Sequence, residues 1–243
     1  MAILVTRPQP DNARTAVALR AQGYEALAAP ALRFEKIPLP PDLGTGFGAV
    51  IVTSVNALRG LADQPAATRL VHLPVFAVGD RTAQAAQDTG FRDITSAGGD
   101  ADDLLALLTA RAPATTPLLY LAGADISRDL KAELDPRGFE IATHTTYRMT
   151  PVADLPDDVT AAFAAGRIDA VLHYSRRSAR AFFAAAGLAG VEISALATAH
   201  LCLSGAVARV AHDAGATNVM IAAAPDEDSL FAALTRAIPP NAR

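Results

Sequence analysis

The sequence predicts an α/β protein with two similar lobes, each a doubly wound parallel sheet, and a cleft between the lobes. Three observations predict this fold. The chain contains a two-fold internal repeat, in which DADDLLALLTARA (100–112) is similar to DEDSLFAALTRAI (226–238). Short apolar segments alternate with amphipathic segments in both halves. The apolar segments are continuous aliphatic and β-branched runs, which are typical of parallel strands buried on both faces.

The first half begins with the aliphatic run ILVT, and each later strand is predicted from a similar run. Amphipathic segments lie between these runs, and Ser54, a favourable N-cap residue, stands where one of them begins. We expect strands at 2–6, 24–28, 48–53, 74–78 and 92–95, and helices at 10–22, 54–63, 79–89 and 100–111.

The second half repeats this order. GAVIVTSVNALRG (48–60) matches DAVLHYSRRSARAFF (169–183), which places Ser175 on Ser54. VFAVGDRTAQAAQDTG (75–90) matches LCLSGAVARVAHDAG (201–215). We expect strands at 117–121, 139–143, 168–173, 199–203 and 218–222, and helices at 125–136, 175–186, 204–214 and 226–237.

Two proline-containing stretches, 34–41 and 147–156, are predicted to be linkers. Each follows the second strand of its half, so the two occupy equivalent places in the repeat. We therefore expect the chain to cross between the lobes at both.

The composition favours a globular protein whose main ligand is neither nucleic acid nor a membrane. Of the 243 residues 51% are hydrophobic, and the net charge is −4. The single cysteine, Cys202, lies in an apolar run and excludes an internal disulfide. No signal segment is recognisable, and no apolar run reaches the roughly 18 residues of a membrane span. We expect a cytoplasmic protein.

No motif for a nucleotide, a metal or a hydrolase nucleophile is recognisable. The segment GTGFGA (44–49) has the glycine spacing of a dinucleotide loop, but it precedes a strand instead of following one. The five histidines are scattered. His173 and His200 lie in or beside apolar strands, where we interpret them as satisfied core groups. We predict neither a cofactor nor a metal.

Hydroxyl groups, glycines and arginines gather at the carboxyl ends of the predicted strands. Ligands bind at these ends in open α/β sheets, and each turn there opens a helix whose free N–H groups attract anions. The serines among them can also be simple N-caps, which does not exclude ligand contact. The candidate substrate-binding residues are Arg7, Thr53, Ser54, Asn56, Gly79, Arg81, Thr82, Gly123, Arg128, Ser175, Arg176, Ser204 and Gly205.

These segments make the chain resemble the uroporphyrinogen-III synthase family over essentially its whole length. The resemblance depends on the order and spacing of short motifs, each of which is moderately degenerate. They are ILVTRP (3–8), VIVTSVNAL (50–58), AVGDRTAQAA (77–86), LLYLAG (118–123), RDL (128–130), Tyr147-Arg148, HYSRRSA (173–179) and CLSGAVA (202–208).

The resemblance implies two α/β lobes with interlaced connectivity, because in this family the beginning and the end of the chain share one lobe. Here one lobe would contain 1–35 and 150–243, and the other would contain 36–149. The two proline-containing stretches lie at both crossings.

The resemblance also implies the reaction, which closes the linear tetrapyrrole hydroxymethylbilane to uroporphyrinogen III, inverts ring D and releases water without a cofactor or metal. Loss of the ring A hydroxyl leaves an electrophile that pyrrole carbons attack, so the protein mainly orients its substrate. Tyr147 matches the family tyrosine proposed to assist the departing hydroxyl, although packing is an alternative interpretation. Thr82 matches a family threonine, but its repeat partner, Val207, has no hydroxyl.

The implied substrate carries eight carboxylates. Since the net charge of the chain is negative, short-range donors at helix N-termini are expected to hold them. Gly79 and Gly205 are expected to need positive φ or to allow close approach of the ligand. The resemblance further implies a monomer that contacts the upstream bilane-forming deaminase transiently. Two alternatives stay open, a non-catalytic two-lobed binding module for a small anionic ligand and a transferase that uses a nucleotide sugar.

Overall fold

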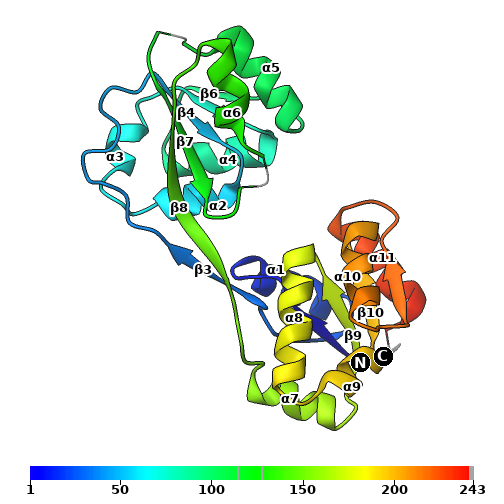
Figure 1. Ribbon diagram of the computed structural model, residues 1–243. Helices are drawn as coiled ribbons and strands as arrows, with labels where there is room; N and C mark the ends of the chain where they lie inside the picture. Colours follow the sequence, from blue (N-terminus) through cyan, green and yellow to red (C-terminus); the bar gives the residue numbers. More distant parts are fainter. Residues whose placement is uncertain (114, 127, 241–243) are drawn as a thin grey trace. The chain divides into compact units, whose positions relative to one another are not determined.

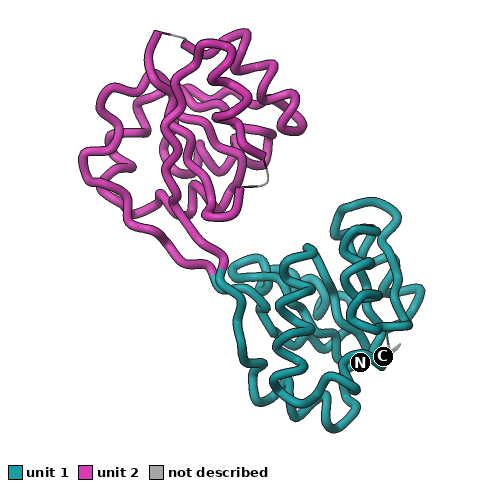
Figure 2. The backbone as a smooth tube through the Cα atoms, in the orientation of Figure 1, with its two compact units in different colours: residues 1–33, 150–243 teal, residues 34–149 magenta. Residues whose placement is uncertain are grey.

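The computed structural model describes residues 1–113, 115–126 and 128–240. It contains two mostly parallel sheets, each covered by helices (Figure 1). The chain divides into two compact units (Figure 2). Unit 1 contains residues 1–33 and 150–243, and unit 2 contains residues 34–149. The predicted α/β class with two parallel sheets is confirmed.

The sheet of unit 1 takes its strands from both ends of the chain. β1 (Ala2–Val5) pairs in parallel with β2 (Glu25–Ala28) on one side and with β9 (Ile168–His173) on the other. β10 (Ala199–Cys202) and β11 (Val219–Ile221) complete the order β11-β10-β9-β1-β2. Because Ile3 lies beside Ala170, the predicted interlaced connectivity is confirmed.

Helices cover both faces of this sheet. α1 (Asp11–Ala21) and α11 (Glu227–Ala237) bury Leu19, Leu230 and Leu234 against one face, together with Ile3 and Val5 of β1. α8 (Arg176–Leu188) and α10 (Gly205–Asp213) cover the other face around Cys202. Two shorter helices, α7 (Asp157–Ala164) and α9 (Glu192–Ala197), belong to the same unit.

The elements of the second sheet and its helices follow one another along the middle of the chain. They are β3 (Leu32–Lys36), β4 (Ala49–Val52), α2 (Val55–Leu61), α3 (Ala67–Leu70), β5 (Val75–Ala77), α4 (Asp80–Thr89), β6 (Ile94–Ser96), α5 (Ala101–Arg111), β7 (Leu118–Gly123), α6 (Leu130–Leu134), a 3-10 turn (Asp135–Arg137) and β8 (Ile141–Pro151).

The strand order of this sheet is β3-β8-β7-β4-β5-β6. Alternate residues of β4 point to opposite faces, as the pleat of a strand requires. Val50 and Val52 pack with residues of α2 and α4, whereas Ala49 and Ile51 pack with residues of α5 and α6.

The two stretches predicted as linkers contain paired strands. The Ile37 N–H donates to the Thr146 carbonyl at 2.9 Å, and the Val152 N–H donates to the Ala31 carbonyl at 3.0 Å. Since residue numbers rise along one strand as they fall along the other, β3 and β8 are antiparallel. β3 lies at the sheet edge and its prolines follow it, so they interrupt no hydrogen bonding. The proline pattern alone did not predict this pairing.

The short helices were the other elements that sequence patterns missed. The sequence predicted none of α3, α7 and α9, each of which is eight residues or fewer. The helix expected at 125–136 is reduced to α6, and residue 127 lies outside the described residues. Such short segments show few turns of a periodic pattern, and unlike α2, which follows the N-cap Ser54, none of the three has a side-chain cap that marks its start.

A pair of buried histidines joins β9 to β10. His173 Nε2 lies 3.0 Å from His200 Nδ1, and His200 Nε2 lies 3.0 Å from the Ala195 carbonyl. Both rings are fully buried, and Phe182 and Phe183 pack around them. Their predicted place in the core is confirmed, but within the described residues His173 Nδ1 has no hydrogen-bond partner. Burial lowers the pKa of His200 to about 4 and that of His173 well below its usual value.

We expect this pair to make unit 1 sensitive to acid. The histidines stay neutral in the fold, whereas the unfolded chain protonates them below pH 6.5. The free energy of unfolding should therefore fall as pH drops from 6.5 towards about 4, by up to about 1.4 kcal/mol per pH unit for each histidine. Urea unfolding across this range measures the slope. His200→Leu should reduce the slope and the exposed control His72→Asn should not, and an unchanged slope in His200→Leu would contradict the assignment.

Candidate functional site

The strand order of each sheet reverses at one point, and several predicted site residues lie there. In unit 1 the reversal lies between β1 and β9, because β2 follows β1 on one side while β10 and β11 follow β9 on the other. In unit 2 it lies between β4 and β7. Ligands of open α/β sheets bind outside the carboxyl ends of strands at such a switch point.

Two phenol groups meet hydroxyl groups at the switch point of unit 2. The Tyr147 hydroxyl on β8 donates to Ser54 Oγ at 3.4 Å, and the Tyr120 hydroxyl on β7 lies 2.9 Å from Thr53 Oγ1. Ser54 also caps α2, since its Oγ accepts from the Asn56 N–H at 3.1 Å. Burial raises the pKa of Tyr120, which keeps that phenol a hydrogen-bond donor. The structure therefore brings together Thr53, Ser54, Asn56 and Tyr147 of the predicted set.

The ring of Tyr147 is fixed by two residues. Phe34 of β3 stacks on it, with ring centroids 5.5 Å apart and planes inclined by 14°. Gly123 ends β7 directly beside the phenol, because a Cβ atom at Gly123 would lie 2.6 Å from Tyr147 Cζ. Only glycine permits this approach without displacing the ring. Gly123 was selected from the sequence as a binding residue, whereas Phe34 was missed because it lay in a predicted linker.

The turn before α4 differs from expectation. Gly79 is the N-cap of α4 with φ of −164°, which is extended backbone, and Gly205 is the first residue of α10 with open space around its Cα. Of the two alternatives expected for these glycines, the need for positive φ is wrong, and close approach of a ligand stays a prediction. Thr82 is buried one turn into α4, and Arg81 is exposed beside it.

Arg128 is already engaged with two carboxylates. Its Nε and Nη2 each donate to Glu133 at 2.6 Å, and its Nη1 lies 2.7 Å from Asp102. This pairing holds the pKa of Glu133 below its usual value. Sequence reasoning did not foresee these two ion pairs, and the binding of a ligand by Arg128 stays a prediction.

At the switch point of unit 1, Arg7 follows β1 and Tyr174 follows β9. The Arg7 guanidinium lies 4.3 Å above the centre of the Tyr174 ring, and its Nη1 donates to Glu227 at 2.9 Å. Arg7 was predicted, but Tyr174 and Glu227 were not. One signal was available, because Glu227 departs from the repeat, where its counterpart is Ala101.

The remaining predicted residues of unit 1 begin helices. Ser175 caps α8, since its Oγ accepts from the Ser178 N–H at 3.1 Å, and Arg176 is exposed next to it. Ser204 is the N-cap of α10, and within the described residues its side chain makes no capping hydrogen bond. Helix capping therefore engages the Ser175 hydroxyl but not the Ser204 hydroxyl.

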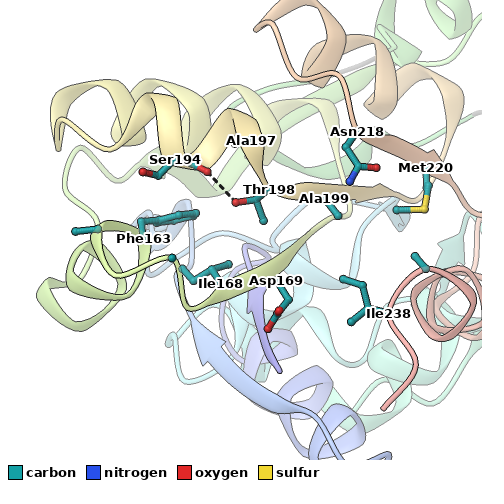
Figure 3. Close-up of a pocket in the computed structure, with 13 residues that line it drawn as sticks. Phe163, Ile168, Asp169, Ser194, Ala197, Thr198, Ala199, Asn218, Met220 and Ile238 are labelled. Carbon is teal, nitrogen blue, oxygen red and sulfur yellow. Dashed lines mark hydrogen bonds between the residues drawn. The ribbon is translucent and has the colours of Figure 1, made fainter. Parts of the chain in front are cut away.

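A cavity of about 730 Å³ lies at the amino ends of the strands of the unit 1 sheet, opposite the carboxyl ends that carry the predicted site residues (Figure 3). It is lined by Ile168 and Asp169 at the start of β9, Ala199 at the start of β10, and Asn218 before β11. None of the predicted site residues lines it. The amino ends of parallel strands are not where such sheets bind ligands, so we do not assign the reaction to it.

The described residues contain neither a metal cluster nor a membrane-spanning helix. In these parts of the chain, no group of three or more His, Cys, Asp or Glu side chains is arranged to hold a metal ion. No described helix combines the length and the hydropathy that crossing a membrane requires.

Comparison with known proteins identifies the family. A family model for uroporphyrinogen-III synthase HemD matches residues 13–232. Uroporphyrinogen-III synthetase from Helicobacter pylori has a similar structure, with a TM-score of 0.64 at 19% identity over 97% of this chain and 98% of that chain. A mutant uroporphyrinogen III synthase from the extremely thermophilic bacterium Thermus thermophilus gives a TM-score of 0.58 at 16% identity over 98% of both chains. No curated protein matches the chain significantly. The structures share the fold, and because the family model covers most of its length, this chain belongs to the uroporphyrinogen-III synthase family.

Proposed function

We propose that this chain closes hydroxymethylbilane to uroporphyrinogen III, with inversion of ring D and loss of water, as a cyclising hydro-lyase of tetrapyrrole biosynthesis. The family match over residues 13–232 carries this proposal. The meeting of Ser54, Gly123 and Tyr147 at a switch point supports it, because open α/β sheets bind their ligands there.

The reaction needs a proton donor at its first step. The bond between the ring A hydroxymethyl carbon and its oxygen breaks, the pyrrole nitrogen supplies electrons, and the oxygen leaves as water once it has gained a proton. In the free protein the Tyr147 phenol donates to Ser54 Oγ at 3.4 Å. In our proposal the phenol turns its one hydrogen to the leaving hydroxyl when the substrate binds, and the Ser54 hydroxyl then donates to the phenol oxygen and holds it in place. The proton lost when the macrocycle regains its pyrrole rings balances the one consumed.

Orientation decides which isomer forms. The substituted carbon of ring D must reach the ring A electrophile first, so that a spirocyclic intermediate forms, fragments and recloses with ring D inverted. Placing two carbons of a flexible bilane in contact is catalysis by proximity. We assign the holding of carboxylates to the starts of α4, α8 and α10, at Gly79, Ser175 and Ser204, where free N–H groups favour anions.

One assay tests the proposal. Purified protein is added to freshly prepared hydroxymethylbilane, and the isomer of the product is identified by chromatography after oxidation to the porphyrin. A synthase gives the type III isomer faster than the bilane closes in buffer. A two-lobed binding module would bind the bilane and leave only the isomer in which ring D is not inverted, which would overturn the proposal.

We expect activity to survive treatment with a chelator followed by exhaustive dialysis. Loss of the ring A hydroxyl turns the substrate itself into the electrophile. The step therefore needs a hydrogen-bond donor, but neither a metal nor a cofactor. Rates are compared before and after treatment, with each common divalent ion added back in turn. Activity that is lost and then restored by one ion would contradict this mechanism.

Three finer expectations stay predictions. They are a cytoplasmic location and, as the family resemblance implies, a monomeric state and a transient contact with the deaminase that supplies the bilane.

A further inference from the structure

One carboxylate oxygen in unit 1 accepts hydrogen bonds from three side chains. Glu227 Oε1 accepts from Thr15 Oγ1 at 2.6 Å, from the Tyr174 hydroxyl at 2.8 Å and from Arg7 Nη1 at 2.9 Å. The donors come from three places, namely helix α1, the turn after β9 and the turn after β1. Three converging donors, one of them charged, form the kind of site that binds a carboxylate.

This cluster lies at the carboxyl ends of β1 and β9, between which the strand order of unit 1 reverses. That position is where an open α/β sheet binds its ligand. Its occupant is a side chain of the same protein. At the unit 1 switch point, the three converging donors therefore bind a carboxylate that belongs to the same chain.

The donors are held more firmly than the acceptor. Thr15 is fully buried, and the Arg7 side chain is 15% exposed, whereas the Glu227 side chain is 36% exposed. Arg7 has further partners, since it lies over the Tyr174 ring at 4.3 Å and its Nη2 lies 3.5 Å from Asp11. These contacts keep the donors in place when Glu227 turns away.

Helix α11 does not depend on Glu227. Its N-cap is Asp226, which accepts from the Ser229 N–H at 2.7 Å, and Leu230 and Leu234 anchor the helix in the core. Glu227 is the first residue of the helix, so its side chain can move to solvent while the backbone stays. An incoming carboxylate accepts the same three hydrogen bonds that Glu227 gives up, so the exchange leaves none of these donors unpaired.

We propose that Arg7, Thr15 and Tyr174 form a carboxylate-binding site, the Arg7 site, which Glu227 occupies in the free protein and which a substrate carboxylate takes by displacing it. The proposal rests on the proposed function in one respect, since the ligand is the polycarboxylate tetrapyrrole. Glu227 acts as an internal competitor and raises the KM. No bond is made or broken; one carboxylate replaces another on the same three donors.

The test compares variants with opposite expected effects. Glu227→Ala removes the competitor, and we expect the KM for hydroxymethylbilane to fall about three- to tenfold, with kcat within about twofold of the wild type. Tyr174→Phe removes one donor, and we expect the KM to rise about fivefold. Asp228→Asn is the matched control, because it removes the charge of an exposed neighbour on the same turn and should leave the KM unchanged.

A second measurement separates this proposal from the proposed function. Binding of uroporphyrin III, an octacarboxylate, is followed by its fluorescence for each variant, and it should show the same order of affinities as the KM. Binding that follows this order without turnover would refute the synthase and keep the Arg7 site. Turnover with equal affinities in Glu227→Ala and Asp228→Asn would refute the Arg7 site and keep the synthase. Absence of both binding and turnover in the wild type would overturn both proposals.

Glu227→Gln is the second variant if Glu227→Ala unfolds. It keeps the shape and one acceptor oxygen but removes the charge that attracts Arg7, so the KM should fall in the same direction by a smaller factor. A KM in Glu227→Gln equal to or above that of the wild type would assign Glu227 to a structural role.

Discussion

Replacing Tyr147 with Phe is expected to slow ring closure by about 10- to 100-fold while the product stays the type III isomer. The substitution removes only the hydroxyl that donates to Ser54 Oγ at 3.4 Å. The ring keeps its stacking on Phe34 and its contact with Gly123, so the fold of the bilane on the protein is unaltered. The measurement is the steady-state kcat, with isomer analysis of the product.

A second tyrosine provides the control. The Tyr24 hydroxyl donates to the Ile238 carbonyl at 2.7 Å and lies before β2, away from the carboxyl ends of the strands. Tyr24→Phe should cost about 1 kcal/mol of stability and leave the rate unchanged. If Tyr147→Phe also turns over at the wild-type rate, Tyr147 has a packing role and the acid must be sought elsewhere.

The sequence predicted those features that depend on local patterns. Aliphatic runs identified the strands buried on both faces, such as β1, β4 and β10, because these leave an unbroken apolar segment. They missed β3 and found only the first three residues of β8, which is partly exposed along its length. The repeat predicted two related sheets. Ser54 and Gly123 were found as candidates because both stand at the ends of predicted strands, which is where the topology of the sheet brings them together.

Features that depend on distant pairing were not predictable. Phe34 reaches Tyr147 only because β3 and β8 run antiparallel, and the prolines beside these strands indicated linkers instead. Arg128 was selected from the sequence as a ligand for a carboxylate, but its ion pairs with Asp102 and Glu133 were not predicted. The number of charged residues is known from the sequence, but which of them form ion pairs depends on the fold.

Gly123→Ala should reduce kcat about as much as Tyr147→Phe, by roughly 10- to 100-fold. A methyl group at this position would lie 2.6 Å from Tyr147 Cζ and 2.8 Å from its hydroxyl oxygen. Phe34 stacks on the same ring, so the phenol must tilt, and its hydroxyl then leaves the position set by Ser54. Because the displaced atoms are the far end of a side chain, the free energy of unfolding should fall by no more than about 1–2 kcal/mol.

The double variant decides whether this loss acts through Tyr147. If Gly123 serves to place the phenol, adding Gly123→Ala to Tyr147→Phe should lower kcat by less than about threefold further, because the hydroxyl that the methyl group would misplace is already gone. Gly187→Ala is the matched control, since Gly187 lies in α8 with open space around it and should tolerate the methyl group. Multiplicative losses in the double variant would show that Gly123 acts on the substrate directly, through close approach of the backbone, and not through Tyr147.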